Sequence, residues 1–310
     1  MRLIITGGLG HIGSGILNSI SKIKNLKQVL IIDNLMSNKT NVLFDLKKMK
    51  NTKFIFFNQD MNKLNFDKIF KKNDIVIHLG AITNATESFK IRKELFNNNY
   101  LSTIKIYKSS LKKNIKCIFF SSTSVYGTNH KIMFEDNYNN LNPQSPYAEC
   151  KLKEEKFINK NANSRKKNMI ILRLGTIFGI SKGMRFHTAV NKFCFQAATN
   201  KPLTIWRTAY NQKRPYLDLN DAIKCIKFVI KNNIFDNNTY NVATCNITPK
   251  TLIKKIKKYK KIKIKFVKNK IMNQLSFEVN CDKIRKTGFK FDGNLNDQIK
   301  KTLNLFGAIN

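Results

Sequence analysis

The sequence has few acidic residues, no paired cysteines and no long apolar segment. Only 19 Asp and Glu residues accompany 57 Lys and Arg residues, which gives a formal net charge of +38. The six cysteines are scattered singly, so they form neither the Cys-x-x-Cys pairs of zinc sites nor a disulfide framework. No apolar stretch approaches the ~18 residues that a membrane span requires, and Met1-Arg2 runs directly into Leu-Ile-Ile-Thr-Gly-Gly without room for a signal peptide. We therefore expect a cytoplasmic protein with reduced thiols, no bound metal and no membrane association.

The strong positive charge could attract a nucleic acid. However, 8 of the 57 basic residues are arginine, and the lysines are accompanied by abundant Asn and Ile, as an AT-rich coding bias would favour. Base and phosphate recognition usually relies on clustered arginine forks interleaved with aromatic residues, and no such patch is visible. The densest basic run, residues 254–270, is typical of a helix end followed by an alternating strand. We therefore favour a solvated lysine surface over a nucleic-acid partner.

Short apolar runs alternate with longer segments of helical period in the first half of the chain. This alternation is typical of a parallel sheet covered by helices on both faces. Strands are predicted at residues 2–6, 28–33, 53–58, 75–79, 116–121 and 169–174. Crossover helices are predicted at residues 12–23, 90–112 and 146–161. The sequence therefore predicts an α/β fold with a doubly wound parallel sheet.

A glycine-rich segment, Thr6-Gly7-Gly-Leu-Gly10-His-Ile-Gly13, follows the first predicted strand and opens a helix. Its glycines would allow a tight turn and close approach to a pyrophosphate, which the N-terminus of the helix would hold. Asp33 ends the next strand, 33 − 13 = 20 residues after Gly13, where a carboxylate can bind both ribose hydroxyls of an adenosine. It would repel a 2'-phosphate, and no arginine follows in residues 34–37, so we favour NAD over NADP. The structural alternative is a glycine turn with a capping aspartate.

Two further strand ends could contact the same ligand. Asp60 follows the third strand, where its carboxylate could accept a hydrogen bond from the adenine amino group or could cap a turn. His78-Leu79-Gly80-Ala81 ends the fourth strand with two small residues, which would let the backbone pass close to a ligand. Tight packing is the alternative explanation for these small residues.

Tyr147 and Lys151 lie four residues apart in Ser-Pro-Tyr-Ala-Glu-Cys-Lys, one helical turn from each other on the same face. A nearby ammonium favours phenolate and would lower the pKa of tyrosine from its usual ~10. The fifth strand ends in Ser121-Ser-Thr-Ser-Val-Tyr-Gly127, which places hydroxyls at the carboxyl edge of the sheet. One of them could steady a reacting oxygen while Tyr147 exchanges its proton. These residues therefore predict hydride chemistry on an alcohol.

Taken in this order, the motifs resemble those of the extended short-chain dehydrogenase/reductases that act on nucleotide sugars, the NAD-dependent epimerases and dehydratases, with the UDP-glucose 4-epimerases as the nearest members. The resemblance spans almost the whole chain. It implies a Rossmann-type sheet with a smaller α/β substrate-binding lobe. It further implies that Ser122 is the hydroxyl partner, that Tyr147 is the acid–base, and that Lys151 also binds the nicotinamide ribose.

The motifs and the resemblance together imply two sets of contacts. The expected cofactor contacts are Gly7, Gly10, His11, Ile12, Gly13, Asp33, Asn34, Asp60, Met61, Leu79, Gly80, Ala81, Asn99, Tyr147, Lys151 and Leu174. The expected substrate contacts are Thr83, Ser122, Thr123, Tyr147, Thr176, Arg185, Asn191, Trp206 and Arg214. Arg214 would clamp a diphosphate, because a guanidinium fork suits it by geometry and charge, and Arg207 would lie near the nucleotide. For Arg185 and Asn191, a surface salt bridge or a helix cap is the alternative.

The chain also departs from patterns within the family. Dehydratases carry adjacent Asp and Glu where this chain has Thr123 and Ser124, so the acid–base pair for eliminating water is missing. The reductase that makes GDP-fucose uses a cysteine and a histidine beside the sugar, and residues 121–127 contain no cysteine. Typical 4-epimerases have an asparagine where Arg173-Leu-Gly-Thr176 has its threonine.

The resemblance therefore predicts C4 epimerisation of a UDP-hexose through a 4-keto intermediate, with tightly held NAD. A net oxidoreductase or decarboxylase on the same kind of substrate is the enzymatic alternative. A dinucleotide-sensing or RNA-binding protein without turnover is the alternative from another class.

The same resemblance suggests how the chain is divided. Residues 1–175 would form the NAD-binding domain, joined by a helix and a strand that return within 216–245. Residues 176–215 and 246–310 would form the smaller nucleotide-sugar-binding lobe. By analogy, the two long helices predicted at 90–112 and 146–161 would pair with their copies in a homodimer.

Overall fold

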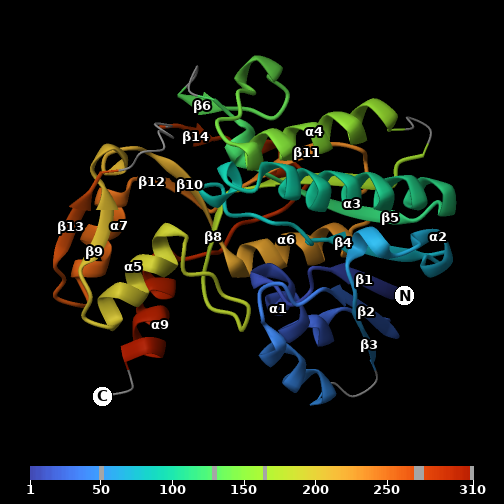
Figure 1. Ribbon diagram of the computed structural model, residues 1–310, viewed down its shortest axis with the longest axis horizontal. Coiled ribbons are helices and arrows are strands. Elements are labelled where there is room, and N and C mark those ends of the chain that lie inside the picture. Colours follow the sequence, from blue (N-terminus) through green and yellow to red (C-terminus); the bar gives the residue numbers. More distant parts are fainter. Residues whose placement is uncertain (49–51, 128–130, 163–165, 269–275, 308–310) are drawn as a thin grey trace.

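Seven parallel strands form the central sheet of the computed structural model, which describes residues 1–48, 52–127, 131–162, 166–268 and 276–307 (Figure 1). Their order across the sheet is β11-β7-β5-β4-β1-β2-β3. The strands are β1 (Arg2–Thr6), β2 (Gln28–Asp33), β3 (Lys53–Asn58), β4 (Asp74–His78), β5 (Lys116–Ser122), β7 (Met169–Leu174) and β11 (Thr239–Val242). The order reverses next to β1, so the crevice at the carboxyl end of β1 and β4 is the place where such sheets bind ligands.

Helices cover both faces of this sheet, and alternating strand residues divide between two apolar clusters. Leu3 and Ile5 pack in one cluster with α1 (His11–Asn18) and α6 (Leu219–Lys231). Ile4 packs in the other cluster with α2 (Phe66–Ile69), α3 (Arg92–Lys113) and α4 (Pro146–Asn161). Because both faces are buried, the strands are continuous apolar runs rather than alternating ones. The doubly wound α/β prediction is confirmed.

The predicted element boundaries are close to those of the structure. Four of the six predicted strands have the predicted ends, and the other two differ by one residue. Helix α4 begins and ends as predicted, because the Ser145 hydroxyl caps its first turn by accepting from the Ala148 N–H at 3.2 Å and Pro146 occupies the first helical position. Helix α1 is shorter than predicted, since it ends at Asn18 and a 3₁₀ turn, η1 (Ile20–Lys22), follows.

The rest of the chain builds smaller sheets beside the carboxyl end of the main sheet. One joins β8 (Thr176–Phe178), β10 (Arg214–Asp218) and β12 (Cys245–Ile247). The others pair β9 (Leu203–Trp206) with β13 (Ile264–Val267) and β6 (Ile132–Met133) with β14 (Glu278–Val279). Helices α5 (Ala189–Ala198), α7 (Pro249–Lys257) and α9 (Leu295–Gly307) enclose a third apolar cluster with β8, β9 and β10, and α8 (Asp282–Lys286) lies near β11.

A helix and a strand, α6 and β11, lie within the predicted return segment 216–245, and β11 pairs with β7 of the central sheet. Tyr216, at the start of that segment, belongs to β10 of the small sheet and to the third apolar cluster. The domain boundaries themselves stay a prediction.

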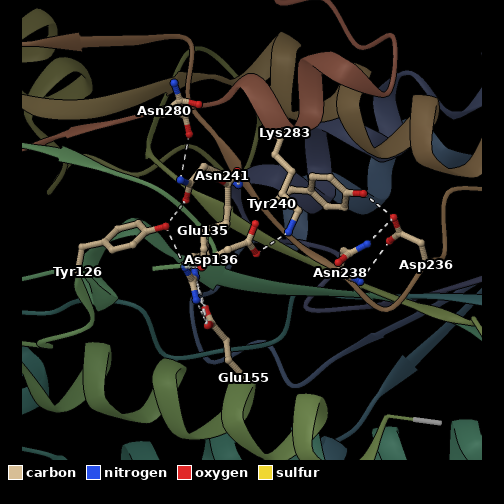
Figure 2. A network of polar contacts seen from close by, with 11 residues as sticks. Tyr126, Glu135, Asp136, Glu155, Asp236, Asn238, Tyr240, Asn241, Asn280 and Lys283 are labelled. Atoms are coloured by element: carbon tan, nitrogen blue, oxygen red, sulfur yellow. Dashed lines mark hydrogen bonds and ion pairs between the residues drawn. The ribbon is translucent and has the colours of Figure 1, made fainter. Parts of the chain in front are cut away.

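A buried guanidinium anchors helix α4 to the sheet (Figure 2). Arg173 of β7 is 1% exposed, and its Nη2 and Nε donate to the Glu155 carboxylate of α4 at 2.6 and 2.9 Å. Its Nη1 donates to the Tyr126 hydroxyl at 2.8 Å, and that hydroxyl donates to Asn241 Oδ1 of β11 at 2.8 Å. A buried charge is tolerated only when it is paired and hydrogen-bonded. This network therefore fixes α4 against β7 and β11.

Among the residues that the structure describes, none of the helices has both the length and the apolar character to cross a membrane. Within the same ranges, no group of three or more His, Cys, Asp or Glu side chains is placed to hold a metal ion. All six cysteines are free thiols, and only Cys245 is more than marginally exposed.

We expect Glu155→Gln to lower the free energy of unfolding by about 3 kcal/mol, because it leaves the buried Arg173 guanidinium without a counter-charge. Urea unfolding monitored by circular dichroism measures the change. Glu149→Gln on the same helix is the matched control, because Glu149 forms an exposed pair with Arg92 and should contribute under about 1 kcal/mol. Equal losses for the two variants would contradict the anchoring role of Arg173.

Candidate active site

The glycine turn after β1 forms a close-packed cradle that larger residues could not build. Gly7 has φ +63°, and a Cβ there would lie 2.6 Å from the Gly80 backbone at the end of β4. A Cβ on Gly13 would overlap the carbonyl oxygen of Gly8. Helix α1 begins at His11, and its N-cap residue, Gly10, provides no side-chain cap. The first N–H groups and the positive dipole end of the helix can therefore hold an anion.

Asp33 lies beside this turn, as the sequence predicts. Its carboxylate accepts from the Leu9 N–H at 3.1 Å and from the Leu35 N–H at 3.0 Å. It lines a cavity of about 470 Å³ with Gly7, Gly10, Asn34, Met61, Leu79, Gly80, Ala81 and Thr83. We call this the Asp33 cavity. A carboxylate at the wall of a cavity next to an anion-binding turn suits the ribose of a dinucleotide.

Asp60 is placed as a cap rather than as part of this wall. Its Oδ1 accepts from the Asn62 N–H at 2.9 Å at the start of the turn η3 (Met61–Lys63). The neighbouring Gln59 and Met61 line the Asp33 cavity, whereas Asp60 does not. The geometry thus agrees with the alternative of a capping residue.

A second cavity of about 430 Å³ adjoins the first and holds the expected catalytic residues. Its lining includes Ser122, Tyr147 and Lys151, and it also includes the predicted residues Gly7, Gly10, His11, Ile12, Gly13, Leu79, Ala81, Thr83, Leu174, Thr176, Arg185, Trp206 and Arg214. We call this the Tyr147 cavity. The structure therefore brings most of the predicted cofactor and substrate residues around one space at the carboxyl edge of the sheet.

Tyr147 and Lys151 lie one turn apart near the start of α4, with Lys151 6% exposed. The Ser122 side chain, at the end of β5, lines the same cavity as Tyr147 and acts to lower the pKa of its phenol. Ser122 Oγ in turn accepts from the Ser124 N–H at 3.1 Å and the Ser124 hydroxyl at 2.9 Å. A phenol, a hydroxyl and an ammonium thus meet at one wall of the cavity, which is the arrangement that proton exchange with a substrate alcohol requires.

The pKa of Tyr147 corrects the sequence-based expectation. Burial raises it above the ordinary value for tyrosine, although Lys151 and Arg185 act in the opposite direction. The expected lowering requires that the charge of Lys151 is not offset by a partner. In the structure, Lys151 Nζ donates to Glu154 Oε2 at 2.8 Å. The phenol is therefore protonated at neutral pH in this state of the protein.

At two positions, a neighbour of the predicted residue lines the cavity instead of the predicted residue itself. Thr123 is 4% exposed, its hydroxyl donates to the Leu174 carbonyl at 3.4 Å, and Ser124 rather than Thr123 lines the Tyr147 cavity. Asn99 is fully buried. Its side-chain amide accepts from the Ile82 N–H and donates to the Ile82 carbonyl, both at 2.8 Å. Asn98 lines the Asp33 cavity instead. Asn99 thus holds the loop after β4 rather than facing a ligand from the cavity wall.

Arg185 reaches both cavities, but Asn191 does not. Arg185 Nη1 donates to Thr83 Oγ1 at 2.6 Å, and burial lowers the pKa of the guanidinium. Asn191, which is fully buried, accepts from the Gly179 N–H at 3.1 Å and donates to the Arg185 carbonyl at 3.0 Å. It therefore fixes the loop that carries Arg185 and acts as a support rather than as a cavity-lining residue.

Arg214 and Trp206 also line the Tyr147 cavity. Burial lowers the pKa of Arg214 to about 10, and its guanidinium lies 5.8 Å from the ring centre of Phe277. Trp206 is 39% exposed, so part of its ring is accessible to a ligand. Arg207 does not line this cavity, because its guanidinium stacks 4.9 Å from the ring centre of Phe266.

Several lining residues have no signal in the sequence. The Tyr147 cavity includes His187, Lys192 and Tyr216, and the Asp33 cavity includes Lys39 and His187. His187 and Lys192 lie in irregular or helical segments far from any motif, where the direction of a side chain depends on tertiary packing. Ser124 had a signal, because it is separated by one residue from Ser122 in a run of hydroxyl side chains.

Comparison with known proteins agrees with this geometry. The NAD dependent epimerase/dehydratase family matches residues 3–243. A dTDP-D-glucose 4,6-dehydratase of Dictyostelium discoideum is 30% identical over 261 residues, which are 78% of this chain and 58% of that protein. The chain thus spans less than two thirds of the length of this relative.

Two solved structures resemble the whole chain. The UDP-N-acetylglucosamine 4-epimerase of Methanobrevibacter ruminantium M1, in complex with UDP-N-acetylmuramic acid, has a TM-score of 0.85 and 26% identity, with 99% of this chain and 98% of that chain covered. The UDP-glucuronic acid 4-epimerase of Bacillus cereus, in complex with UDP-glucuronic acid and NAD, has a TM-score of 0.85 and 24% identity, with both chains fully covered. At this lower identity, the second likeness shows a shared fold.

We expect Asp33→Asn to weaken NAD binding about tenfold and to reduce the preference for NAD over NADP, because the variant loses a charged hydrogen-bond acceptor and no longer repels a 2'-phosphate. Isothermal titration with each nucleotide measures both effects. Asp60→Asn is the comparison, since asparagine caps a turn as well as aspartate does, and its NAD affinity should equal that of the unchanged protein. An unchanged nucleotide preference in Asp33→Asn would contradict the assignment of Asp33 to the ribose.

Proposed function

Because the chain belongs to the NAD dependent epimerase/dehydratase family, we propose that it is a nucleotide-sugar epimerase that inverts C4 of a hexose, with a UDP-hexose as the substrate. The reaction passes through a 4-keto sugar and regenerates the cofactor. The Methanobrevibacter structure, a UDP-N-acetylglucosamine 4-epimerase, supports this proposal by its likeness over nearly the full length of the chain.

One observation favours epimerisation over elimination of water. The described residues that line the Tyr147 cavity include serines, Tyr147, lysines and arginines, but no Asp or Glu. Elimination needs a positioned acid–base pair in addition to Tyr147, and positions 123 and 124 are Thr and Ser. The similarity to a 4,6-dehydratase therefore extends to the fold and the cofactor turn but not to this pair.

The residues of the site have distinct roles in the proposed reaction. Tyr147 exchanges the proton of the 4-hydroxyl, and Ser122, which lines the same cavity, orients the reacting oxygen. Lys151 supplies positive charge next to Tyr147. When bound, NAD would supply the hydride acceptor and donor, held by the turn at Gly7–Gly13 and by Asp33.

Substrate binding in this proposal is concentrated at the diphosphate. Arg214 offers one guanidinium in the lining of the cavity, and Arg185 offers a second one that acts on Tyr147. A sugar held by its diphosphate can turn about the bonds that join the two while its nucleotide stays in place. Turning presents the opposite face of C4, which inversion requires.

We also propose that the protein is a homodimer. Helices α3 and α4 lie side by side on one flank of the molecule (Figure 1), and Leu101 of α3 is 51% exposed. Two such helices from each copy could form a four-helix contact.

The free thiols at all six cysteines support a cytoplasmic location, where thiols remain reduced.

We expect the purified protein with NAD to interconvert the C4 epimers of a UDP-hexose without net absorbance change at the nicotinamide band. Tyr147→Phe should lower kcat by about 10²–10⁴-fold, because it removes the group that exchanges the proton. Chromatography of the sugar nucleotides measures the rate, and titration with NAD confirms that the variant still binds cofactor. Stoichiometric formation of NADH would favour a net oxidoreductase or a decarboxylase. Failure to interconvert any UDP-, dTDP-, GDP- or CDP-hexose pair would refute the epimerase.

We expect Leu101→Glu to convert the dimer to a monomer, because the new charge would be buried at the α3–α4 contact. Light scattering coupled to gel filtration measures the mass. Leu305→Glu is the matched control, since Leu305 is 48% exposed and its helix, α9, lies away from α3 and α4 (Figure 1). A monomeric unchanged protein, or a dimer that persists in Leu101→Glu, would rule out this interface.

A further inference from the structure

Helix α4 contains a buried ion pair whose carboxylate, Glu154, has no role in the reaction described above. Lys151 Nζ donates to Glu154 Oε2 at 2.8 Å, and the side chains of the two residues are 7% and 6% exposed. Burying two charges is costly, and a pair of this kind often contributes nothing to stability relative to apolar residues. Its position next to Tyr147 therefore suggests a role in the site.

The carboxylate of Glu154 is held by further buried groups. Cys150 Sγ lies 3.5 Å from its Oε1. Burial raises the pKa of the Glu154 carboxyl, whereas Lys151, Cys150 and Thr103 of α3 act in the opposite direction. Thr103 Oγ1 also lies 3.0 Å from Nε2 of His78, whose Nδ1 lies 2.7 Å from Thr6 Oγ1. Side chains from four elements, namely α3, α4, β4 and β1, thus lie together in one buried polar cluster.

The hydrogen bonds of this polar cluster can be assigned so that each group donates to the next, from Gly80 to Thr103. The Gly80 N–H donates to Thr6 Oγ1 at 3.3 Å, so the Thr6 hydroxyl is available to donate to Nδ1 of His78. Nε2–H of His78 then donates to Thr103, whose side chain acts to lower the pKa of the Glu154 carboxyl. This assignment requires a neutral histidine, and burial lowers the pKa of His78 to about 3, so it is neutral. Glu154 cannot turn away from Lys151 without losing the buried ion pair.

We propose that Glu154 is a positioning residue that fixes the ammonium of Lys151 and offsets its charge beside Tyr147. The catalytic meaning of this inference rests on the proposed function, in which Tyr147 exchanges the substrate proton. The charge arrangement itself does not depend on that function.

The groups that face the pair support a specific effect of Glu154. Burial raises the pKa of Tyr147, Lys151 and Arg185 lower it, and Glu154 raises it. His78 and Cys150 add no charge, because burial lowers the pKa of the histidine and raises that of the thiol. Arg185, on the loop before α5, is thus the cation that Glu154 leaves uncompensated.

The inference is tested by titrating Tyr147 without cofactor or substrate. Protein labelled with ¹³C at tyrosine Cζ is followed by NMR from neutral pH to the onset of unfolding, and Tyr147→Phe assigns the resonance. We expect Glu154→Gln to lower the titration midpoint of Tyr147 by about one pH unit or more, as expected for removing a charge within several ångströms in a partly buried site. Glu149→Gln is the control, because it removes the same charge from α4 at an exposed pair with Arg92.

Two more variants separate charge from a general loss of structure. Glu154→Asp retains the charge and should keep the midpoint close to that of the unchanged protein. Lys151→Met combined with Glu154→Met removes both charges, and its midpoint should lie above that of Glu154→Gln. If the titration midpoint of Tyr147 is the same in Glu154→Gln, in Glu149→Gln and in the unchanged protein, the inference is wrong. Because no turnover is measured, this result is independent of whether the protein proves to be an epimerase.

Discussion

The site depends on how two adjacent carboxylates of helix α4 are paired with cations in the interior of the protein. Glu155 faces the sheet and pairs with Arg173 of β7, whereas Glu154 pairs with Lys151 on its own helix. Both pairs are almost completely buried, so each carboxylate requires its cation and each cation its carboxylate. The first pair sets where α4 lies, and the second sets where the ammonium of Lys151 lies relative to Tyr147. The position of the reactive phenol thus follows from electrostatic constraints that act away from any ligand.

The site also shows why the spacing of two residues does not determine their chemistry. Tyrosine and lysine one helical turn apart indicate an activated phenol, and the structure does place them together at the cavity wall. The net direction of the pKa is nevertheless upward, because burial and Glu154 outweigh Lys151 and Arg185. A sequence shows which charges are present, but their balance depends on depth below the surface. The positive charge of a bound nicotinamide ring would shift this balance towards the phenolate.

Much of the fold could be predicted from the sequence, because continuous apolar runs of strand length separated by helical segments have few other solutions. The cofactor turn, Asp33, Ser122, Tyr147 and Lys151 were recognisable because each lies at a strand end or a helix start, where the backbone fixes the direction of the side chain. The differences between the predicted residues and those that line the cavities arose one position away or on irregular loops. Thr123 and Asn99 point inward while Ser124 and Asn98 line the cavities, and a shift of one residue reverses the direction of a side chain. Asn191 required knowledge of the loop that it supports, which no local pattern contains.

The connection between β7 and β11 has a consequence for how the chain is made. Strand β11 closes the sheet beside β7, yet it is translated only after β8, β9 and β10. Every residue of β7 is buried in the finished protein, so a nascent chain that has not reached residue 239 leaves an apolar strand edge unpaired, which invites association with other chains. The ribosome must therefore deliver the chain as far as β11 before this edge can be covered. Shielding of that edge during synthesis, for example by a chaperone, would be as important to the yield of native protein as any contact in the finished fold.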